Sequence, residues 1–215
     1  GVLPKQYPFS RRPAKTGQRL GNAFNAGFLG VDMKPIEKYV FRKYSTNYQA
    51  FFKAEKERLV KVLGSAAKIE HVGSTAIIGL GGKGIVDILI GVSKSKTAAA
   101  KKKLMKSGYL FRANAGTPER LFFRRDYQYK QKKRRVHLHL TKFNGQDWIE
   151  MILFRNYLLS HPKAGKEYVK IKKDAVKKAN GDGETYRKYK EKFIKKSIEK
   201  KFTAILIFSH SFPSK

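Results

Sequence analysis

The chain has 215 residues, and its 48 Lys plus Arg against 16 Asp plus Glu give a formal net charge of +32. Such an excess destabilises a compact protein by self-repulsion unless a partner neutralises it, so we expect a polyanionic partner, with RNA as the first candidate. Because 41% of the residues are hydrophobic, the chain as a whole is not a disordered basic tail. The lack of cysteine excludes disulfides, thiolate zinc sites and cysteine nucleophiles. No apolar run reaches the roughly eighteen residues of a membrane span.

Residues 1–40 predict an extended basic arm. The segment contains four prolines and several glycines and has no sustained hydrophobic periodicity. Its basic cluster consists of Arg11, Arg12, Lys15 and Arg19. Because phosphate contacts need only well-placed cations, we expect this cluster to bind RNA.

From Ser45 the pattern becomes helical, and Gly64 follows the last apolar residue of the helix. Residues 68–72 then predict a short strand, and residues 73–84 predict a glycine-rich loop that can hold a turn of helix. Residues 85–92 are almost continuously apolar, which is typical of a buried central strand. Asp87 interrupts this run, so it is a candidate functional residue.

Residues 97–106 predict a helix that ends at Gly108, and residues 121–125 and 135–141 predict two more strands. His137 and His139 share one face of the second strand, because side chains alternate between faces. A basic hairpin with interleaved tyrosines joins the two strands, and we expect its cations to bind RNA: Arg124, Arg125, Lys132, Lys133, Arg134 and Arg135.

The rest of the chain predicts a helical cap and a tail. Residues 147–160 are helical, Pro162 marks a break before a second helix, and a third helix runs to about residue 201. Residues 202–215 form an apolar tail, in which residues 202–208 are expected to be a strand or a docking segment. Residues 41–201 therefore predict one α+β domain: a mixed β-sheet with flanking helices and a C-terminal helical cap, preceded by the arm.

Gly73 and Ser74 follow one predicted strand, and Asp87 lies on the next. Backbone amides and a hydroxyl at such a turn can hold a phosphate, while the acid can hold Mg²⁺. The same pattern also fits a simple Gly-Ser turn and an aspartate that caps a loop, so spacing alone leaves both interpretations open.

The residue order around this turn is more specific. Residues 70–90 read Glu-His-Val-Gly-Ser-Thr-Ala-Ile-Ile-Gly-Leu-Gly-Gly-Lys-Gly-Ile-Val-Asp-Ile-Leu-Ile, which resembles the signature of the GrpB family of nucleotidyltransferase-like proteins. Residues 136–140 resemble the family's His-x-His strand, and residues 153–162 resemble its Phe-Arg-Asp-Tyr-Leu…His-Pro helix. The resemblance covers residues 40–200 in several motifs in the same order.

The resemblance implies a nucleotidyltransferase-like fold, with Gly73, Ser74 and Lys83 at the nucleotide phosphates and Asp87 as the first metal-binding acid. Two departures bear on activity. Leu89 stands where active nucleotidyltransferases have a second aspartate, and Asn156 replaces the aspartate of the Phe-Arg-Asp motif. Because two-metal phosphoryl transfer needs several carboxylates, Asp87 is catalytic only if activity survives.

His137 and His139 offer a second possibility for Asp87. Together the three side chains can form a His-His-carboxylate set for a softer ion such as Mn²⁺ or Zn²⁺. The alternative is a pair of histidines that form hydrogen bonds in a polar cleft. We expect no required cofactor, and Mg²⁺ or Mn²⁺ only with a surviving nucleotidyltransferase activity.

The sequence therefore favours an RNA-binding structural protein with a GrpB-like nucleotidyltransferase fold. Its expected partners are ribosomal RNA and neighbouring subunits of a ribosome or a similar ribonucleoprotein, inside the cell and plausibly in the mitochondrial or another organellar matrix. A different class, a metal-dependent nucleotidyltransferase acting on a nucleotide or RNA, is the alternative. A peripheral protein on anionic lipid is a third.

Overall fold

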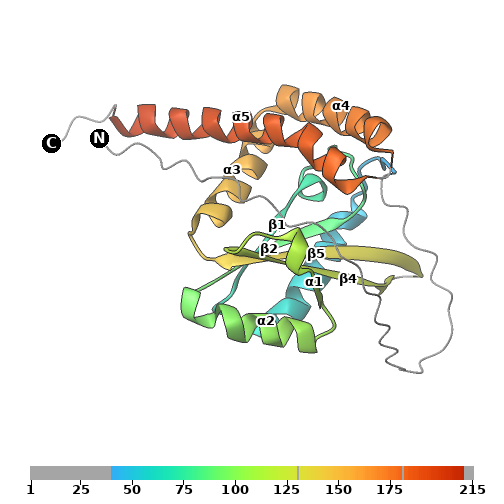
Figure 1. Cartoon of the computed structure of the whole chain (residues 1–215), viewed down its shortest axis with the longest axis vertical. Coiled ribbons are helices and arrows are strands. Elements are labelled where there is room, and N and C mark those ends of the chain that lie inside the picture. The colour runs from blue at the N-terminus through green and yellow to red at the C-terminus, as the bar shows by residue number, and fades with distance from the viewer. Residues whose placement is uncertain (1–39, 130, 181, 211–215) are drawn as a thin grey trace, which may run out of the picture. The chain divides into compact units, whose positions relative to one another are not determined.

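The computed structural model describes residues 40–129, 131–180 and 182–210, so the predicted arm with Arg11, Arg12, Lys15 and Arg19 lies outside the described residues. One five-stranded sheet has the strand order β1-β2-β5-β4-β3 (Figure 1). Its strands are β1 (Lys68–Val72), β2 (Val86–Val92), β3 (Leu110–Phe111), β4 (Arg120–Tyr129) and β5 (Lys132–Lys142). Strands β2 and β5 are parallel and the other neighbours are antiparallel, so the sheet is mixed.

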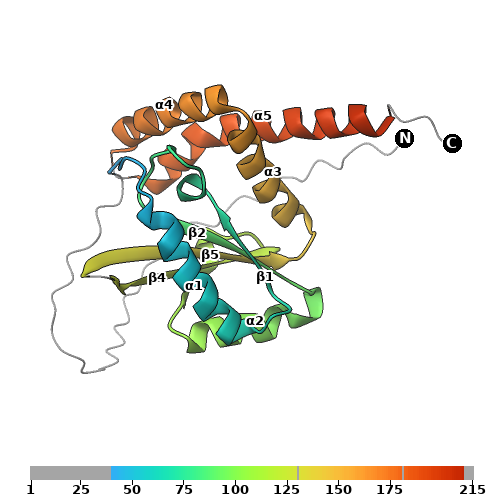
Figure 2. The ribbon, with the colours of Figure 1, turned by 180° about the vertical axis from the view of Figure 1, so that it is seen from behind.

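Two helices, α1 (Asn47–Leu63) and α2 (Thr97–Lys106), cover one face of the sheet (Figure 2). Alternate residues of β2, such as Ile88 and Ile90, point into this layer and pack with Leu59 of α1 and Leu104 of α2 in the main core. Helix α1 ends where Gly64 takes a positive φ of 89° and its amide donates to the Val60 carbonyl. The predicted helix stop at this glycine is confirmed.

The opposite face carries α3 (Gln146–Ser160), α4 (Pro162–Ala179) and α5 (Gly183–His210), which form the helical cap (Figure 1). Trp148 of α3 packs on Val72 and Leu89. Tyr168 of α4 packs with Leu80, and Phe193 of α5 lies against the same cluster. Because β2 is covered on both faces, its sequence is apolar almost throughout.

The predicted α+β architecture with a mixed sheet, flanking helices and a helical cap is confirmed. The glycine-rich loop contains a short 3-10 helix (Ser74–Ala76), and two more such turns lie at Lys94–Lys96 and Ala113–Ala115. The two-residue strand β3 was not predicted, because so short a segment has no periodicity. Within the described residues, no helix is long and apolar enough to cross a membrane.

The prediction of a strand at residues 202–208 is wrong, and the alternative of a docking segment stays a prediction. These residues continue α5, which runs without interruption from Gly183 to His210. The physical reason is the absence of any glycine or proline between residues 184 and 210, so nothing in the local sequence ends the helix.

Candidate functional site: a cationic pocket beside the Gly-Ser turn

The Gly73–Ser74 turn is held directly against Asp87. Strand β1 ends at Val72, whose register partner on β2 is Asp87. Gly73 has a positive φ of 70°, and a Cβ atom at this position would lie 2.6 Å from Asp87 Oδ2. Only glycine fits both the backbone conformation and the contact. The structure therefore brings together the turn and the acid that the sequence singled out.

Both predicted histidines contact the carboxylate of Asp87. In the parallel pairing of β2 with β5, Asp87 lies opposite His137 and Leu89 opposite His139. His137 Nδ1 lies 3.2 Å and His139 Nε2 lies 3.5 Å from the same oxygen, Asp87 Oδ1. Burial opposes ionisation of Asp87, but the hydrogen bonds and charge of the two histidines hold its pKa below its ordinary value. Burial lowers the pKa of His139, and Asp87 offsets part of this effect.

The donor set does not fit a two-metal centre. Asp87 is the one carboxylate among the described residues that line the pocket, whereas Mg²⁺ requires several oxygen ligands. Leu89, at the second acid position, is fully buried against Val72 and Trp148. In the described part of the chain, no group of three or more His, Asp or Glu side chains is arranged to hold a metal ion. The geometry favours the hydrogen-bonded alternative for His137 and His139, and the metal set stays a prediction.

Cations dominate the rest of this pocket, which has a volume of about 340 Å³. The described lining residues include four cations, Lys83, Arg120, Arg187 and Lys190, beside Ser74, Thr75 and the single acid Asp87. Arg120 is ion-paired with Asp147 at 2.9 Å. The ammonium groups of Lys83 and Lys190 lie 4.1 and 4.4 Å from the ring centre of the buried Tyr186.

Burial and neighbouring like charges make protonation of Lys190 in this pocket less favourable. Burial, followed by the charges of Lys83 and Arg187, lowers the pKa of Lys190 to about 8, although Asp87 opposes this shift. Sequence reasoning named Lys83 but missed Arg120, Arg187 and Lys190. The one signal for Lys190 was its spacing of four residues from Tyr186, which places both side chains on the same side of a helix.

A fifth cation, Lys172 of α4, lies directly behind the Gly-Ser turn. Its side chain is only 1% exposed, and its ammonium group donates to Ser74 Oγ at 3.0 Å and to the Gly81 carbonyl. Burial, and then the charge of Lys190, lowers the pKa of Lys172 to about 7. Lys172 therefore connects the helical cap to the predicted phosphate turn by a hydrogen bond. With a pKa of about 7, it changes its charge near neutral pH.

Fewer cations of the basic hairpin are available to a partner than its sequence suggests, because several pair with acids of the protein. Arg135 forms a bidentate pair with Asp126, with distances of 2.6 and 2.8 Å, and Arg124 Nε lies 3.5 Å from the same carboxylate. Arg125 lies 3.6 Å from Glu55 and over the Tyr127 ring. Three of the six predicted hairpin cations are thus engaged within the protein, and the side chain of Lys132 lies outside the described residues.

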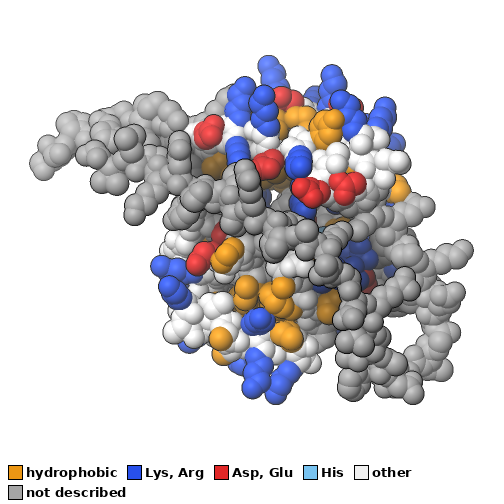
Figure 3. Space-filling view, in the orientation of Figure 1, with side chains coloured by type: hydrophobic (Ala, Val, Ile, Leu, Met, Phe, Trp, Pro, Cys, Tyr) orange, Lys and Arg blue, Asp and Glu red, His pale blue; other side chains and the backbone are white. Residues whose placement is uncertain are grey.

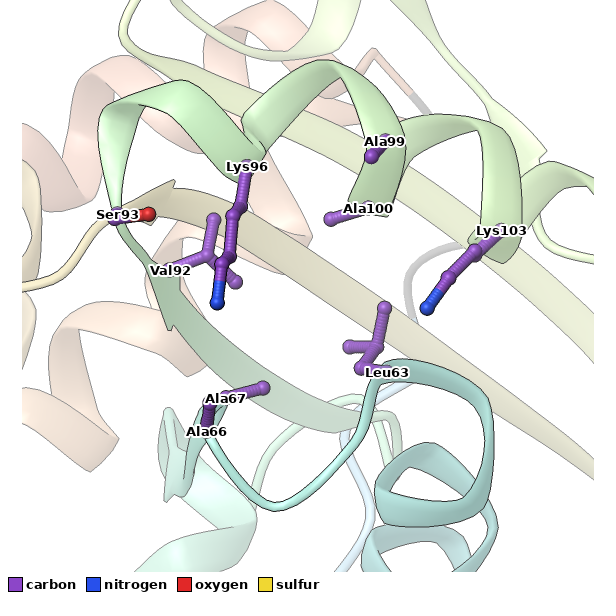
Figure 4. Close-up of a pocket in the computed structure, with 9 residues that line it drawn as sticks. All are labelled: Leu63, Ala66, Ala67, Val92, Ser93, Lys96, Ala99, Ala100 and Lys103. Carbon is purple, nitrogen blue, oxygen red and sulfur yellow. The ribbon is translucent and has the colours of Figure 1, made fainter.

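A second hollow of about 380 Å³ lies on the other face of the sheet, between the end of α1, the end of β2 and α2 (Figure 4). Leu63, Val92 and several alanines line it, and Lys96 and Lys103 extend across it. Its described lining contains no acid, histidine or tyrosine. The second hollow therefore offers the cations Lys96 and Lys103, whereas the pocket beside Asp87 combines cations with an acid and two histidines.

Comparison with known proteins identifies the family of this chain. The family model "GrpB protein" matches residues 39–200, and the chain belongs to the GrpB family. The "Glutamate-rich protein GrpB" of Alkalihalophilus pseudofirmus is 30% identical over 77% of this chain and 95% of its own length. The "UPF0157 protein YqkA" of Bacillus subtilis is 32% identical over 77% of this chain, which spans only 48% of that protein. The crystal structure of "conserved protein GrpB from Enterococcus faecalis" superposes with a TM-score of 0.66 at 25% identity, covering 78% of this chain and 99% of the other.

Proposed function

We propose that this GrpB-family protein binds RNA and that the pocket beside Asp87 takes a phosphate group of that RNA without catalysing two-metal nucleotidyl transfer. The observation that carries the proposal is the charge of the pocket. Arg187 and Lys190 line the pocket beside the single described carboxylate of Asp87, and Lys172 lies behind the turn, so positive charge exceeds the charge of that acid even when Arg120, which pairs with Asp147, is left out.

Burial first, and then neighbouring cations, lowers the pKa values of Lys172 and Lys190. A lysine gives up its proton near neutral pH when burial and neighbouring cations make its charge unfavourable. A bound phosphate would reverse this effect by adding negative charge beside both ammonium groups. The Ser74 hydroxyl group lies beside the Lys172 ammonium group, and the backbone of Gly73 directly precedes it. Backbone amides and a hydroxyl group in such a turn can bind a phosphate.

Charge over the whole chain supports RNA as the source of the phosphate. A net charge of +32 exceeds what a small anion in one pocket can neutralise, whereas a nucleic-acid strand offers many phosphates. We include in this proposal a ribosomal or other ribonucleoprotein particle as the setting. Co-sedimentation of the purified protein with ribosomes tests that part, and protein that stays at the top of the gradient would contradict it.

A metal-dependent nucleotidyltransferase is the second candidate, because the Gly73 turn lies against Asp87 as the resemblance implies for such enzymes. The two candidates predict opposite behaviour for Asp87→Asn. If the pocket only binds phosphate, loss of its one lining carboxylate should tighten binding of 5′-phosphorylated RNA by several-fold. If the protein is an enzyme, the substitution should abolish transfer.

The deciding experiment measures both quantities on the wild-type protein and on Asp87→Asn. RNA affinity is measured by fluorescence anisotropy, and transfer by incorporation of labelled nucleotide with Mg²⁺ or Mn²⁺. Thermal melting confirms that the variant is folded. We expect no incorporation by either protein and tighter binding by the variant. Incorporation by the wild type that disappears in the variant would overturn the proposal.

A further inference from the structure

Helix α4 carries a lysine stripe along its solvent face. Its members recur at intervals of three and four residues and are all exposed: Lys163, Lys166, Lys170, Lys173 and Lys177. At 100° per residue they fall within an arc of about 80°, and at about 1.5 Å per residue the stripe is about 21 Å long. The opposite side of the same helix is buried through Tyr168, Lys172 and Ala175. Lys and Arg side chains gather over this helix in the space-filling view (Figure 3).

The charge of the lysine stripe has no carboxylate partner in the part of the chain that the structure describes. Although α4 contains Glu167 and Asp174, none of the five lysines forms an ion pair among the described residues. Helix α5 differs, because Lys188 pairs with Glu184 at 3.2 Å and Lys195 with Glu191 at 2.8 Å. Three arginines of the hairpin, Arg124, Arg125 and Arg135, are likewise held by Asp126 or Glu55.

We propose that the lysine stripe of α4 is a docking surface for the RNA sugar-phosphate backbone. This inference rests on the proposed RNA binding. It places the main contact between protein and RNA on α4 and not on the basic hairpin. A straight row of exposed ammonium groups can neutralise successive phosphates of one strand without reading its sequence. Because Lys172 on the buried side of α4 holds Ser74, the same helix connects this surface to the phosphate turn.

Anionic lipid is the competing partner for a row of lysines. A helix that binds a membrane surface presents large apolar side chains beside its cations, and no large apolar residue of α4 is exposed. Ile78 and Leu159 are 79% and 51% exposed, and they line an apolar groove together with Lys166 near the start of α4. Ile78 lies on the glycine-rich loop and Leu159 on α3, so neither belongs to the lysine stripe. Because the stripe has no exposed large apolar neighbour on α4, it favours a hydrophilic polyanion over a membrane surface.

The test compares two variants that each lose three positive charges. One is the stripe variant Lys163→Gln, Lys170→Gln and Lys177→Gln, and the other is the matched α5 variant Lys188→Gln, Lys192→Gln and Lys195→Gln. Lys and Gln have similar helix propensities, so both variants should keep the melting temperature of the wild type. Affinity for a short single-stranded RNA is measured over a range of salt concentrations.

For the stripe variant we expect the slope of log affinity against log salt to fall by about 2, since each lost contact to single-stranded RNA contributes about 0.7. Affinity should fall on the order of ten-fold or more at low salt, while the α5 variant should stay close to the wild type.

Equal losses in both variants would overturn the inference and indicate diffuse attraction by net charge. A stripe variant that loses binding to phosphatidylserine vesicles but keeps the wild-type RNA slope would overturn it in favour of lipid. A wild type that does not bind RNA would overturn the proposed function as well.

Discussion

Two acids on opposite sides of the sheet, the buried Glu55 and the partly exposed Asp87, have opposite surroundings. Glu55 of α1 is 3% exposed and accepts hydrogen bonds from the hydroxyl groups of Tyr109 and Tyr127, with Arg125 at 3.6 Å. Asp87 is 27% exposed and lies at the edge of a pocket in which cations outnumber acids. The first cluster is complete within the protein, whereas the second has positive charge in excess of its own acid.

This difference is the one expected between a structural polar cluster and the binding site that we propose. Burial, and then the charge of Glu55, raises the pKa of Tyr109 and Tyr127, so both remain hydroxyl donors across the physiological range. In the pocket, the pKa values of Lys172 and Lys190 move toward neutrality instead. We therefore expect changes at Glu55 to alter stability, and changes around Asp87 to alter ligand binding as well.

The largest effect is expected for Glu55→Ala. It leaves the buried hydroxyl group of Tyr109, the partly buried hydroxyl group of Tyr127 and the mostly buried guanidinium of Arg125 without their acceptor, which should lower the free energy of unfolding by about 3–5 kcal/mol. Urea denaturation measures the loss. Glu55→Gln keeps an acceptor and should cost less. RNA affinity of the folded variants should equal that of the wild type, and a specific loss of affinity would contradict the division between the two clusters.

The next effect is expected for Gly73→Val. A β-branched side chain at positive φ costs about 1–3 kcal/mol, and its Cβ would also displace the Asp87 carboxylate. Gly64→Val is the matched control, because Gly64 also has a positive φ but a Cβ there would meet no atom within 4 Å. Melting and phosphate binding are compared for the two variants. Both should melt lower, but only Gly73→Val should lose phosphate binding; equal binding by both would show that the turn does not hold the phosphate.

A smaller effect is expected from pH. Because the pKa values of Lys172 and Lys190 are lowered to about 7 and 8 in the folded protein, the unfolded chain binds more protons above these values. The unliganded protein should therefore gain stability as pH rises from about 7 toward the ordinary lysine pKa of about 10.4. Phosphate affinity should fall over pH 7–9, because the protonated amines bind the anion.

Lys172→Met sharpens this test, since it removes one of the two titrating groups without leaving a cavity of lysine size. The variant should show a flatter dependence of both stability and phosphate affinity on pH. Calorimetry at several pH values measures the affinity, and denaturation at the same values measures the stability. A variant with the pH dependence of the wild type would show that Lys172 does not titrate in this range.

The smallest effect is expected at the hairpin. Asp126 pairs with Arg135 and lies 3.5 Å from Arg124, so the three groups together carry only about one net positive charge, and Arg124→Gln with Arg135→Gln should change the salt dependence of RNA binding by about one lost phosphate contact. Loss of the Asp126 pair should cost about 1 kcal/mol of stability at most, because these groups are partly exposed. If the slope of log affinity against log salt changes as much as in the stripe variant, the main RNA contact lies on the hairpin and not on α4.

The sequence alone determined the parts of this protein that depend on local pattern. Helix α1 with its stop at Gly64, the buried strand around Asp87 and the pairing of β4 with β5 follow from periodicity and turn residues that act within a few positions of one another. The family could be identified for a similar reason, because its motifs are short and contiguous. The Gly73, Ser74 and Asp87 contact lay within one such motif.

Only the tertiary structure decided which charges are open and which are satisfied. Lys172 and Lys190 reach the Gly-Ser turn from helices about a hundred residues further along the chain, and no local pattern encodes that approach. Asp126 neutralises Arg135 because the antiparallel register places them opposite each other. Charge counted along the sequence treats every lysine and arginine alike, whereas the electrostatic free energy of each depends on the distance to its neighbours and on its burial, which only the packed fold determines.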